Sequence, residues 1–249
     1  MHFEGRPGRT TTDTLHALTY KIKDAWHKKQ VVSVLFLDIE GAFPNAVNER
    51  LIHNLKKCKV PTKLVEFIHN MLNEQFTALK FDDYTSERIA LDNGIGQGDP
   101  LSMALYQYYN ADLLDIPEGA NEAAAAYIDD AILIATAKDF PQAHELIVDM
   151  MTRPGGAIEW SNKHNSKFEF SKLALIDFVH RNSTKQRCSL VLPTATVEPS
   201  PSAKYLEVFL DQYLQWNTQI THAIKKCTTW SSQVRRIAAP SCGLTPKHA

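Results

Sequence analysis

The sequence has few cysteines and no long apolar run, and both shortages exclude classes of protein. The four cysteines are Cys58, Cys188, Cys227 and Cys242. They lie far apart and form no Cys-x-x-Cys pair, so they predict neither a structural zinc site nor a disulfide framework. The longest apolar stretches, 123–128 and 131–135, are far shorter than the roughly 20 residues that a membrane-spanning helix needs. No apolar segment follows Met1, so the sequence predicts no signal peptide and an intracellular protein.

Extreme composition is also absent. Apolar residues make up 44% and charged residues 22% of the 249-residue chain, which is the ordinary globular range and excludes disorder and fibrous rods. The net charge is −1, but residues 1–150 carry 14 Lys and Arg against 22 Asp and Glu, whereas residues 151–249 carry 13 against 6. Such a division is typical either of chance clustering on the surface or of a charged partner or bound cation.

The hydrophobic pattern predicts helices and strands in mixed order, and hence an α+β fold. Helical spacing of apolar residues is found over about 15–26, 46–57, 62–73, 100–114, 141–151 and 216–238. Single strands are predicted at 31–37, 173–178, 188–192 and 204–210, and hairpins at 76–91 and 123–137. The only linker-like segment, 193–202, is too short to mark a domain boundary.

Three carboxylates stand where apolar strands end. Asp38 follows strand 31–37, and Asp129 and Asp130 lie on the tight turn of hairpin 123–137. If these strands are neighbours in one sheet, the acids converge and repel unless one is protonated or a cation bridges them. Mg²⁺ prefers such oxygen ligands, and a pair of ions can clamp the attacking and leaving oxygens of a phosphoryl transfer. The residues alone leave open that each Asp is an ordinary turn residue, which is how we interpret Asp82-Asp83.

Three motifs in a fixed order carry a family resemblance. They are FLDIEGAF at 36–43, GQGDPLS at 96–102 and YIDD at 127–130. Together they resemble the palm motifs of reverse transcriptases, most of all those of non-LTR (LINE-like) retrotransposons and especially the fungal ones. Flanking motifs, GRPGRTTTD at 5–13, HNSKFEFSK at 164–172 and KYLEVFLD at 204–211, extend the resemblance over essentially the whole chain.

The resemblance implies a right-hand polymerase fold, with an antiparallel palm sheet packed on helices. Residues 1–30 would form a partial fingers loop and helix. Residues 31–210 would form the palm, with a fingers insertion at about 46–92. Residues 211–249 would begin the thumb or connection helix. The implied activity is RNA-directed DNA synthesis with two Mg²⁺ ions, or Mn²⁺ in their place. The implied partners are an RNA template, a DNA primer and dNTPs, and the implied location is the nucleus.

The resemblance also assigns roles to matching positions. Asp38, Asp129 and Asp130 would be catalytic and, with the backbone carbonyl of Ile39, would ligate the metal, Asp129 more directly than Asp130. Phe43 would be the steric gate that excludes a ribose 2′-hydroxyl. The other nucleotide-binding positions would be Gln97, Gly98, Tyr127 and Lys172, and those for nucleic acid Arg6, Arg9, Lys204, Tyr205 and Leu206. From the residues alone, Phe43 is equally a core residue, and Lys172, Arg6 and Arg9 are equally solvated surface residues.

Two departures support an alternative reading. Glu4 and Glu207 stand where the family usually carries glycine, and Glu207 would bring a negative charge to the expected path of the primer phosphates. The ends of the chain suggest an internal piece of a longer protein or a decayed copy of one. The alternative is therefore a truncated or degenerate, catalytically inactive fragment that at most binds nucleic acid. A palm polymerase of the group II intron or telomerase type is a further alternative, which the flanking motifs favour less.

Overall fold

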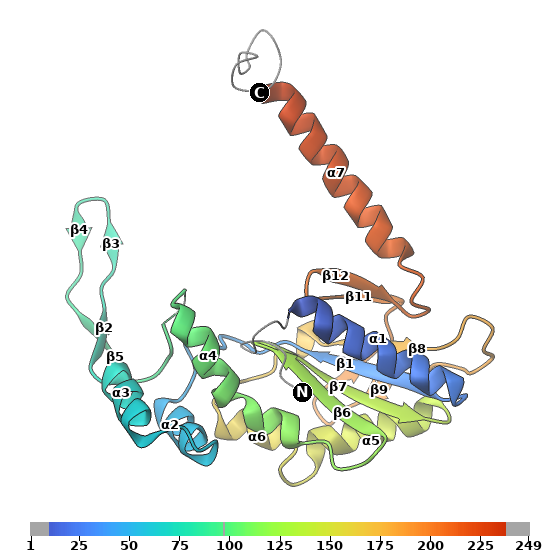
Figure 1. The fold of residues 1–249 in the computed structure, drawn as a ribbon, viewed down its shortest axis with the longest axis horizontal. Helices are drawn as coiled ribbons and strands as arrows, with labels where there is room; N and C mark the ends of the chain where they lie inside the picture. Colours follow the sequence, from blue (N-terminus) through green and yellow to red (C-terminus); the bar gives the residue numbers. More distant parts are fainter. Residues whose placement is uncertain (1–9, 97, 238–249) are drawn as a thin grey trace.

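A four-stranded antiparallel sheet forms the centre of the computed structural model, which describes residues 10–96 and 98–237. The strand order is β6-β7-β1-β8 (Figure 1). The strands are β1 (Val31–Leu37), β6 (Glu122–Tyr127), β7 (Asp130–Ala137) and β8 (Ala174–Phe178). Helices cover both faces of this sheet, so the predicted α+β class is confirmed.

Strand β1 is buried along its whole length because it lies between β7 and β8 and faces a core on each side. Leu35 and Leu37 belong to the core that contains α5 (Phe140–Thr152) and α6 (Ala157–Lys163). Their neighbours on the opposite face belong to the core under α1 (Thr11–His27). A strand with two buried faces needs apolar residues at nearly every position, which explains the run VVSVLFL.

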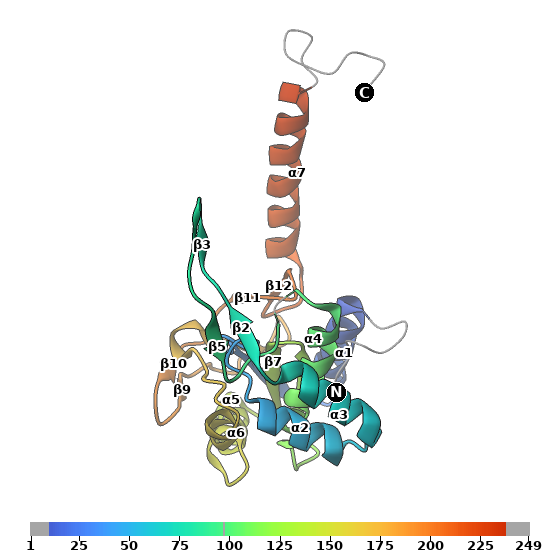
Figure 2. The same cartoon turned by 90° about the vertical axis from the view of Figure 1, so that its left-hand side faces the viewer.

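A second group of helices packs beside the sheet and extends the first core. It consists of α2 (Asn48–Lys57), α3 (Thr62–Leu72), α4 (Pro100–Tyr109) and the 3₁₀ helix η1 (Ala111–Asp115). A long hairpin follows α3 and consists of β2 (Gln75–Thr77), β3 (Lys80–Phe81), β4 (Tyr84–Thr85) and β5 (Ile89–Leu91). Figures 1 and 2 show this hairpin rising from the body on the same side as helix α7 (Asn217–Ile237).

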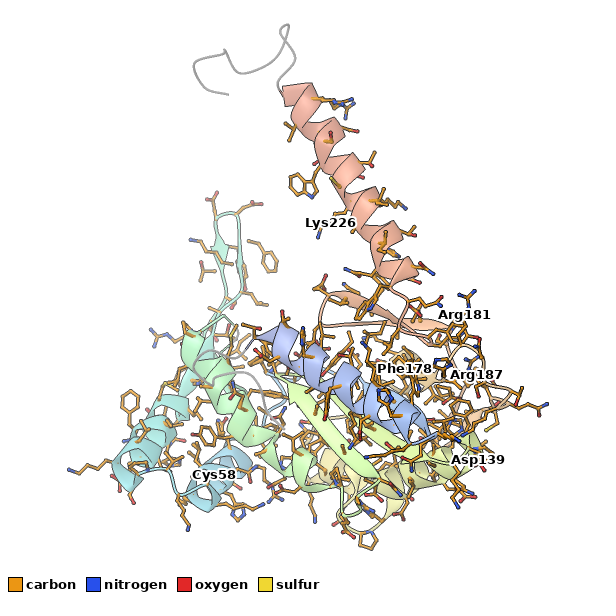
Figure 3. All side chains as sticks on the ribbon, turned by 45° about the vertical axis from the view of Figure 1, so that its right-hand side comes forward. Cys58, Asp139, Phe178, Arg181, Arg187 and Lys226 are labelled. Carbon is orange, nitrogen blue, oxygen red and sulfur yellow. The ribbon has the colours of Figure 1, made fainter. Side chains whose placement is uncertain are left out.

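Helix α7 leaves the body beyond the two-stranded sheet of β11 (Ser202–Tyr205) and β12 (Val208–Asp211). From Ile220 to Arg236 its side chains are exposed, and Figure 3 shows them standing out along the helix, Lys226 among them. Across the described ranges 10–96 and 98–237, no helix is both long enough and apolar enough to cross a membrane.

The structure corrects three local predictions. The strand predicted at 204–210 is the hairpin of β11 and β12, because Leu206 and Glu207 adopt the left-handed backbone conformation, with φ of 49° and 63°. Helix α6 lies in a stretch for which we predicted no helix. The segment read as a linker contains β10 (Thr196–Val197), which pairs with β9 (Leu190–Val191). The 3₁₀ helix η2 (Phe170–Lys172) precedes β8.

Candidate catalytic site

The register of the central sheet brings the three predicted acids together. Strands β1 and β7 are antiparallel neighbours, and Leu37 pairs with Ala131. Asp38 directly follows Leu37, and Asp130, the first residue of β7, directly precedes Ala131, so the two acids adjoin the last pair of this register. Asp129 precedes Asp130 on the turn that joins β6 to β7. The strands are therefore neighbours, which is the condition that the sequence prediction required, and both Asp129 and Asp38 are close enough to affect the charge of Asp130.

The electrostatics of Asp130 reflect this crowding. The pKa of its carboxyl is raised from 3.8 to about 6, first because surrounding protein removes solvent and then because Asp129 and Asp38 repel its charged form. Glu207, from the turn between β11 and β12, raises this pKa further, whereas Lys204 lowers it. Since Asp130 is exposed, solvent screens part of this effect. The departure noted at Glu207 thus lies within electrostatic range of the predicted catalytic acids.

Asp38 is held by contacts from the segment that precedes β8. The Lys172 ammonium lies 3.1 Å from Asp38 Oδ2, and this partner raises the pKa of Lys172. Ile39 forms a bridge with Phe168. The two bonds of this bridge involve the Asp38 carbonyl and the amide of the residue after Ile39, so neither occupies the Ile39 carbonyl. That carbonyl is the backbone ligand predicted from the resemblance.

The loop after Asp38 turns sharply and then presents an aromatic ring. Gly41 has φ of 57°, and a Cβ at this position would lie 2.6 Å from Asn45 Nδ2. Phe43 is half-buried, and its ring centroid lies 5.0 Å from that of the fully buried Tyr106. One part of the Phe43 ring therefore packs on the core and part remains exposed, which accommodates both readings of this residue.

The GQGDPLS motif starts helix α4. Asp99 accepts a hydrogen bond from the Leu101 amide, and Pro100 occupies the first helical turn, so both residues favour a helix start here. Gly98 has φ of 91°, and a Cβ built on it would meet no atom of the described chain within 4 Å.

Tyr127 is half-buried and pairs with Asp130. The predicted positions Arg6, Arg9 and Gln97, and the departure at Glu4, lie outside the described residues.

The hairpin of β11 and β12 modifies one prediction. Lys204 is exposed and lies 2.6 Å from Glu207, which lowers the pKa of that glutamate. Leu206 is half-buried on the turn. Tyr205 is only 3% exposed and packs against Phe36 with ring centroids 5.4 Å apart, and burial raises the pKa of its hydroxyl. The side chain of Tyr205 is therefore core, so only its backbone remains for the predicted nucleic-acid contact.

The donor set fits a cation that shares its ligands with a substrate. Within residues 10–96 and 98–237, no group of three or more His, Cys, Asp or Glu is arranged to hold a metal ion by itself. Mg²⁺ usually binds through one or two carboxylates together with substrate phosphates and water, so a complete protein cage is not expected. Asp38 and Asp130 at the ends of the neighbouring strands β1 and β7, and Asp129 on the turn from β6 to β7, match that incomplete shell.

Sequence reasoning overlooked two buried residues next to this site, Tyr106 and Asn110. Both are 0% exposed, and Asn110 Nδ2 donates a hydrogen bond to the Ile128 carbonyl on the turn that carries Asp129. The available signal was their separation by four residues at the end of the helix after GQGDPLS, because this spacing places two side chains on one helix face.

Comparison with protein families and curated proteins gives concordant matches. The family described as reverse transcriptase (RNA-dependent DNA polymerase) matches residues 2–206. The chain is 23% identical over 239 residues to the probable RNA-directed DNA polymerase from transposon BS of Drosophila melanogaster, covering 94% of this chain and 26% of that protein. It is 25% identical over 221 residues to the X-element counterpart of the same species, covering 88% and 24%. The chain thus spans about a quarter of the length of these relatives.

A partial match and two solved structures complete the comparison. Over 127 residues the chain is 29% identical to the Pol polyprotein of the type-1 retrotransposable element R2 of Bradysia coprophila, covering 47% of this chain and 14% of that protein. Apo telomerase from Candida tropicalis superposes with a TM-score of 0.58 at 10% identity, covering 83% of this chain and 36% of that one. The apo telomerase of the same species truncated from its C-terminal domain superposes with a TM-score of 0.56 at 12% identity, covering 83% of this chain and 40% of that one. At such identities the structural likeness supports the fold alone.

Proposed function

Because the chain belongs to the reverse transcriptase (RNA-dependent DNA polymerase) family, we propose that it forms the catalytic core of a LINE-like retrotransposon polymerase. Its reaction would be RNA-directed DNA synthesis, in which a primer 3′-hydroxyl attacks the α-phosphate of a dNTP and pyrophosphate leaves. The observation that supports this proposal is the β1–β7 register, whose last pair, Leu37 and Ala131, is flanked by Asp38 on one strand and by Asp130 and then Asp129 on the other. The fungal subtype and the nuclear location remain predictions.

The acids would hold the metal. Asp38 and Asp129 would be the main ligands, with Asp130 and the Ile39 carbonyl in support. Two Mg²⁺ ions, when bound, supply positive charge that activates the attacking hydroxyl and stabilises the leaving oxygen. The pKa of Asp130 is raised by burial and then by repulsion from Asp129 and Asp38, and this repulsion supports the assignment because clustered carboxylates favour a divalent cation. Mn²⁺ would substitute for Mg²⁺, since both are hard cations that accept oxygen ligands.

Neighbouring residues would position the nucleotide and the template. Phe43, supported from below by Tyr106, would place its ring under the incoming sugar and exclude a ribose 2′-hydroxyl. Gly98 would allow close approach of a base, because it has no side chain and a Cβ there would meet no described atom. Lys172 presents an exposed ammonium beside Asp38, within reach of phosphates that would share the metal.

One observation favours the inactive alternative. Glu207 raises the pKa of Asp130, so its charge acts on the catalytic acids, and it sits on a left-handed turn where the family usually carries glycine. A negative group at this place would repel the primer phosphates. Lys204 offsets it in part through the 2.6 Å ion pair.

The deciding experiment measures Mg²⁺-dependent dNTP incorporation on a primed RNA template. Asp129→Asn is the matched control, because it keeps the size of the side chain and removes its charge. Incorporation by the parent chain and none by Asp129→Asn is the expected result. A parent chain no more active than this control would contradict the polymerase proposal. Activity that appears only in Glu207→Gly would instead identify the glutamate as the defect that makes this chain inactive.

A second arm tests the role of Phe43. Phe43→Val should increase ribonucleotide incorporation relative to deoxynucleotide incorporation, because a smaller side chain leaves room for the 2′-hydroxyl. Tyr20→Val is a suitable control, since Tyr20 is an exposed aromatic residue on α1. An unchanged ratio in Phe43→Val would assign Phe43 to the core and not to substrate selection.

A further inference from the structure

The turn that presents the catalytic acids has a strained backbone. Ile128 and Asp129 form a two-residue loop between Tyr127 and Asp130. Ile128 has a positive φ of 56°, whereas Asp129, the other loop residue, does not have a positive φ. A positive φ at the first loop residue alone matches a type II′ turn, in which that position usually holds glycine. A β-branched residue rarely adopts this conformation, so the surrounding structure must stabilise it.

Asn110 provides a direct contact with this turn. Its Nδ2 atom donates a hydrogen bond of 2.5 Å to the Ile128 carbonyl, and Asn110 is fully buried. The backbone of Asn110 is also fixed, because its amide donates to the Tyr106 carbonyl and its own carbonyl accepts from the Leu113 amide. A buried side-chain amide on a doubly anchored backbone has little freedom to point elsewhere.

The same face of α4 makes further contacts with the site. Tyr106, one helical turn before Asn110, packs on Phe43. Burial raises the pKa of the Tyr106 hydroxyl, and the charges of Tyr109 and Asp129 raise it further. The end of α4 is held in turn by Asn54 of α2, whose Nδ2 donates to the carbonyls of Tyr108 and Tyr109 at 3.1 and 3.0 Å. Asn54 thus contacts the backbone at the end of α4, whereas Asn110 contacts the turn itself.

We propose that Asn110 is a positioning residue for nucleotidyl transfer. Its amide holds the Ile128 carbonyl and thereby keeps the strained turn in the conformation that presents Asp129 and Asp130. This inference rests on the proposed polymerase function. Reactive groups must be held to within a fraction of an ångström, so a turn that relaxes from its strained form would misplace both carboxylates without unfolding the protein.

The first test separates turnover from binding. Asn110→Asp keeps the shape of the side chain and replaces the amide donor by a carboxylate, and Asn110→Ala removes the polar group. Both should lower kcat about 10- to 100-fold, the range for a small misplacement of reacting groups. The KM for dNTP and the Kd for primer–template should change less than about threefold, because the Asn110 side chain is fully buried and has no surface to offer a ligand. Parent-like kcat in Asn110→Ala, whose side chain has no donor, would overturn the proposal.

Asn54→Ala is the matched control. It removes a buried amide that donates to backbone carbonyls at the same end of α4, but it removes no donor to the catalytic turn. Its Tm should fall at least as much as that of Asn110→Ala, whereas its kcat, measured below both transitions, should stay within about threefold of the parent value. If Asn54→Ala lost as much kcat as Asn110→Ala, activity would depend on the overall stability of α4, and a specific role for Asn110 would be overturned.

Amide hydrogen exchange tests the inference independently of activity. In Asn110→Ala, a peptide covering 127–131 should exchange about tenfold faster, while a peptide from β8 should be unchanged, because only the turn loses its support. Unchanged exchange in 127–131 would overturn the inference whether or not the chain polymerises. If the 127–131 peptide exchanges faster in Asn110→Ala but the parent chain is no more active than Asp129→Asn, the polymerase function and the positioning role in it are both refuted. Asn110 would then only stabilise the conformation of the turn.

Discussion

The loop between Asp38 and Phe43 depends on glycine at position 41, and replacing it tests the site in two ways. Gly41 has a left-handed φ of 57°, and a Cβ there would lie 2.6 Å from Asn45 Nδ2. This Asn45 amide donates a 3.1 Å hydrogen bond to the Glu40 carbonyl. Gly41→Ala therefore strains the backbone and pushes the amide away from its acceptor.

The expected loss of stability is the net of three contributions. A left-handed conformation destabilises an alanine by about 1–2 kcal/mol. The displaced amide forfeits one exposed hydrogen bond, about 0.5–1.5 kcal/mol. The unfolded chain loses freedom when glycine becomes alanine, which offsets about 0.4–1 kcal/mol. The free energy of unfolding of Gly41→Ala should thus fall by about 0.5–3 kcal/mol, as measured by equilibrium urea denaturation.

Gly155→Ala is a control with the same backbone problem and no steric contact. Gly155 has φ of 77°, and a Cβ there would meet no atom of the described chain within 4 Å. It lies in the turn between α5 and α6, away from the predicted acids. Gly155→Ala should lose about 0.5–1.5 kcal/mol less than Gly41→Ala, because it displaces no hydrogen bond.

The two variants should also differ in activity. Gly41→Ala shifts the loop that carries Asp38 and Phe43 and should lower dNTP incorporation about tenfold at temperatures where the protein is folded. Gly155→Ala should keep parent activity. Equal stability losses and equal activities in the two variants would refute the reasoning that close approach of Asn45 requires glycine at position 41.

Three further predictions concern other charged and polar groups. The fully buried Asp177 accepts a hydrogen bond from His144 at 2.9 Å, so His144→Leu should lower the free energy of unfolding by about 3–5 kcal/mol. Adding Asp177→Leu to this variant should recover part of the lost stability. Equal losses in the single and the double variant would refute the pairing. Burial lowers the pKa of His164 from 6.5 to about 4. The unfolded state then binds more protons between these values, so the contribution of His164 to stability is present above pH 6.5 and falls by about 2 kcal/mol from pH 7 to pH 5. The difference between the urea midpoints of the parent and His164→Gln should therefore change over this range. Glu207→Gly should increase dNTP incorporation by removing negative charge and backbone strain together; Glu207→Gln should recover only the part due to charge, and equal activity in all three chains would show that Glu207 does not limit the site.

Much of the architecture follows from local patterns in the sequence. The uninterrupted run VVSVLFL predicted a buried strand at 31–37, and the structure has β1 with the same bounds. The apolar runs on either side of Asp129-Asp130 predicted a hairpin, and β6 and β7 form it. These predictions succeeded because strand burial and tight turns depend on residues close together in the chain. The sequence did not predict the hairpin at 202–211, because no glycine or asparagine marks its left-handed turn at Leu206 and Glu207.

The sequence by itself thus determined the family, the order of the motifs and the acids that would meet if two strands were neighbours. Tertiary structure alone decided that β1 pairs with β7 in the register whose last pair adjoins Asp38 and Asp130. It also placed Glu207 within electrostatic range of Asp130 and the amide of Asn110 on the Ile128 carbonyl. The physical reason is sequence distance: these side-chain contacts and strand pairs join residues 18 to 106 positions apart, and periodicity within a segment has no information about them.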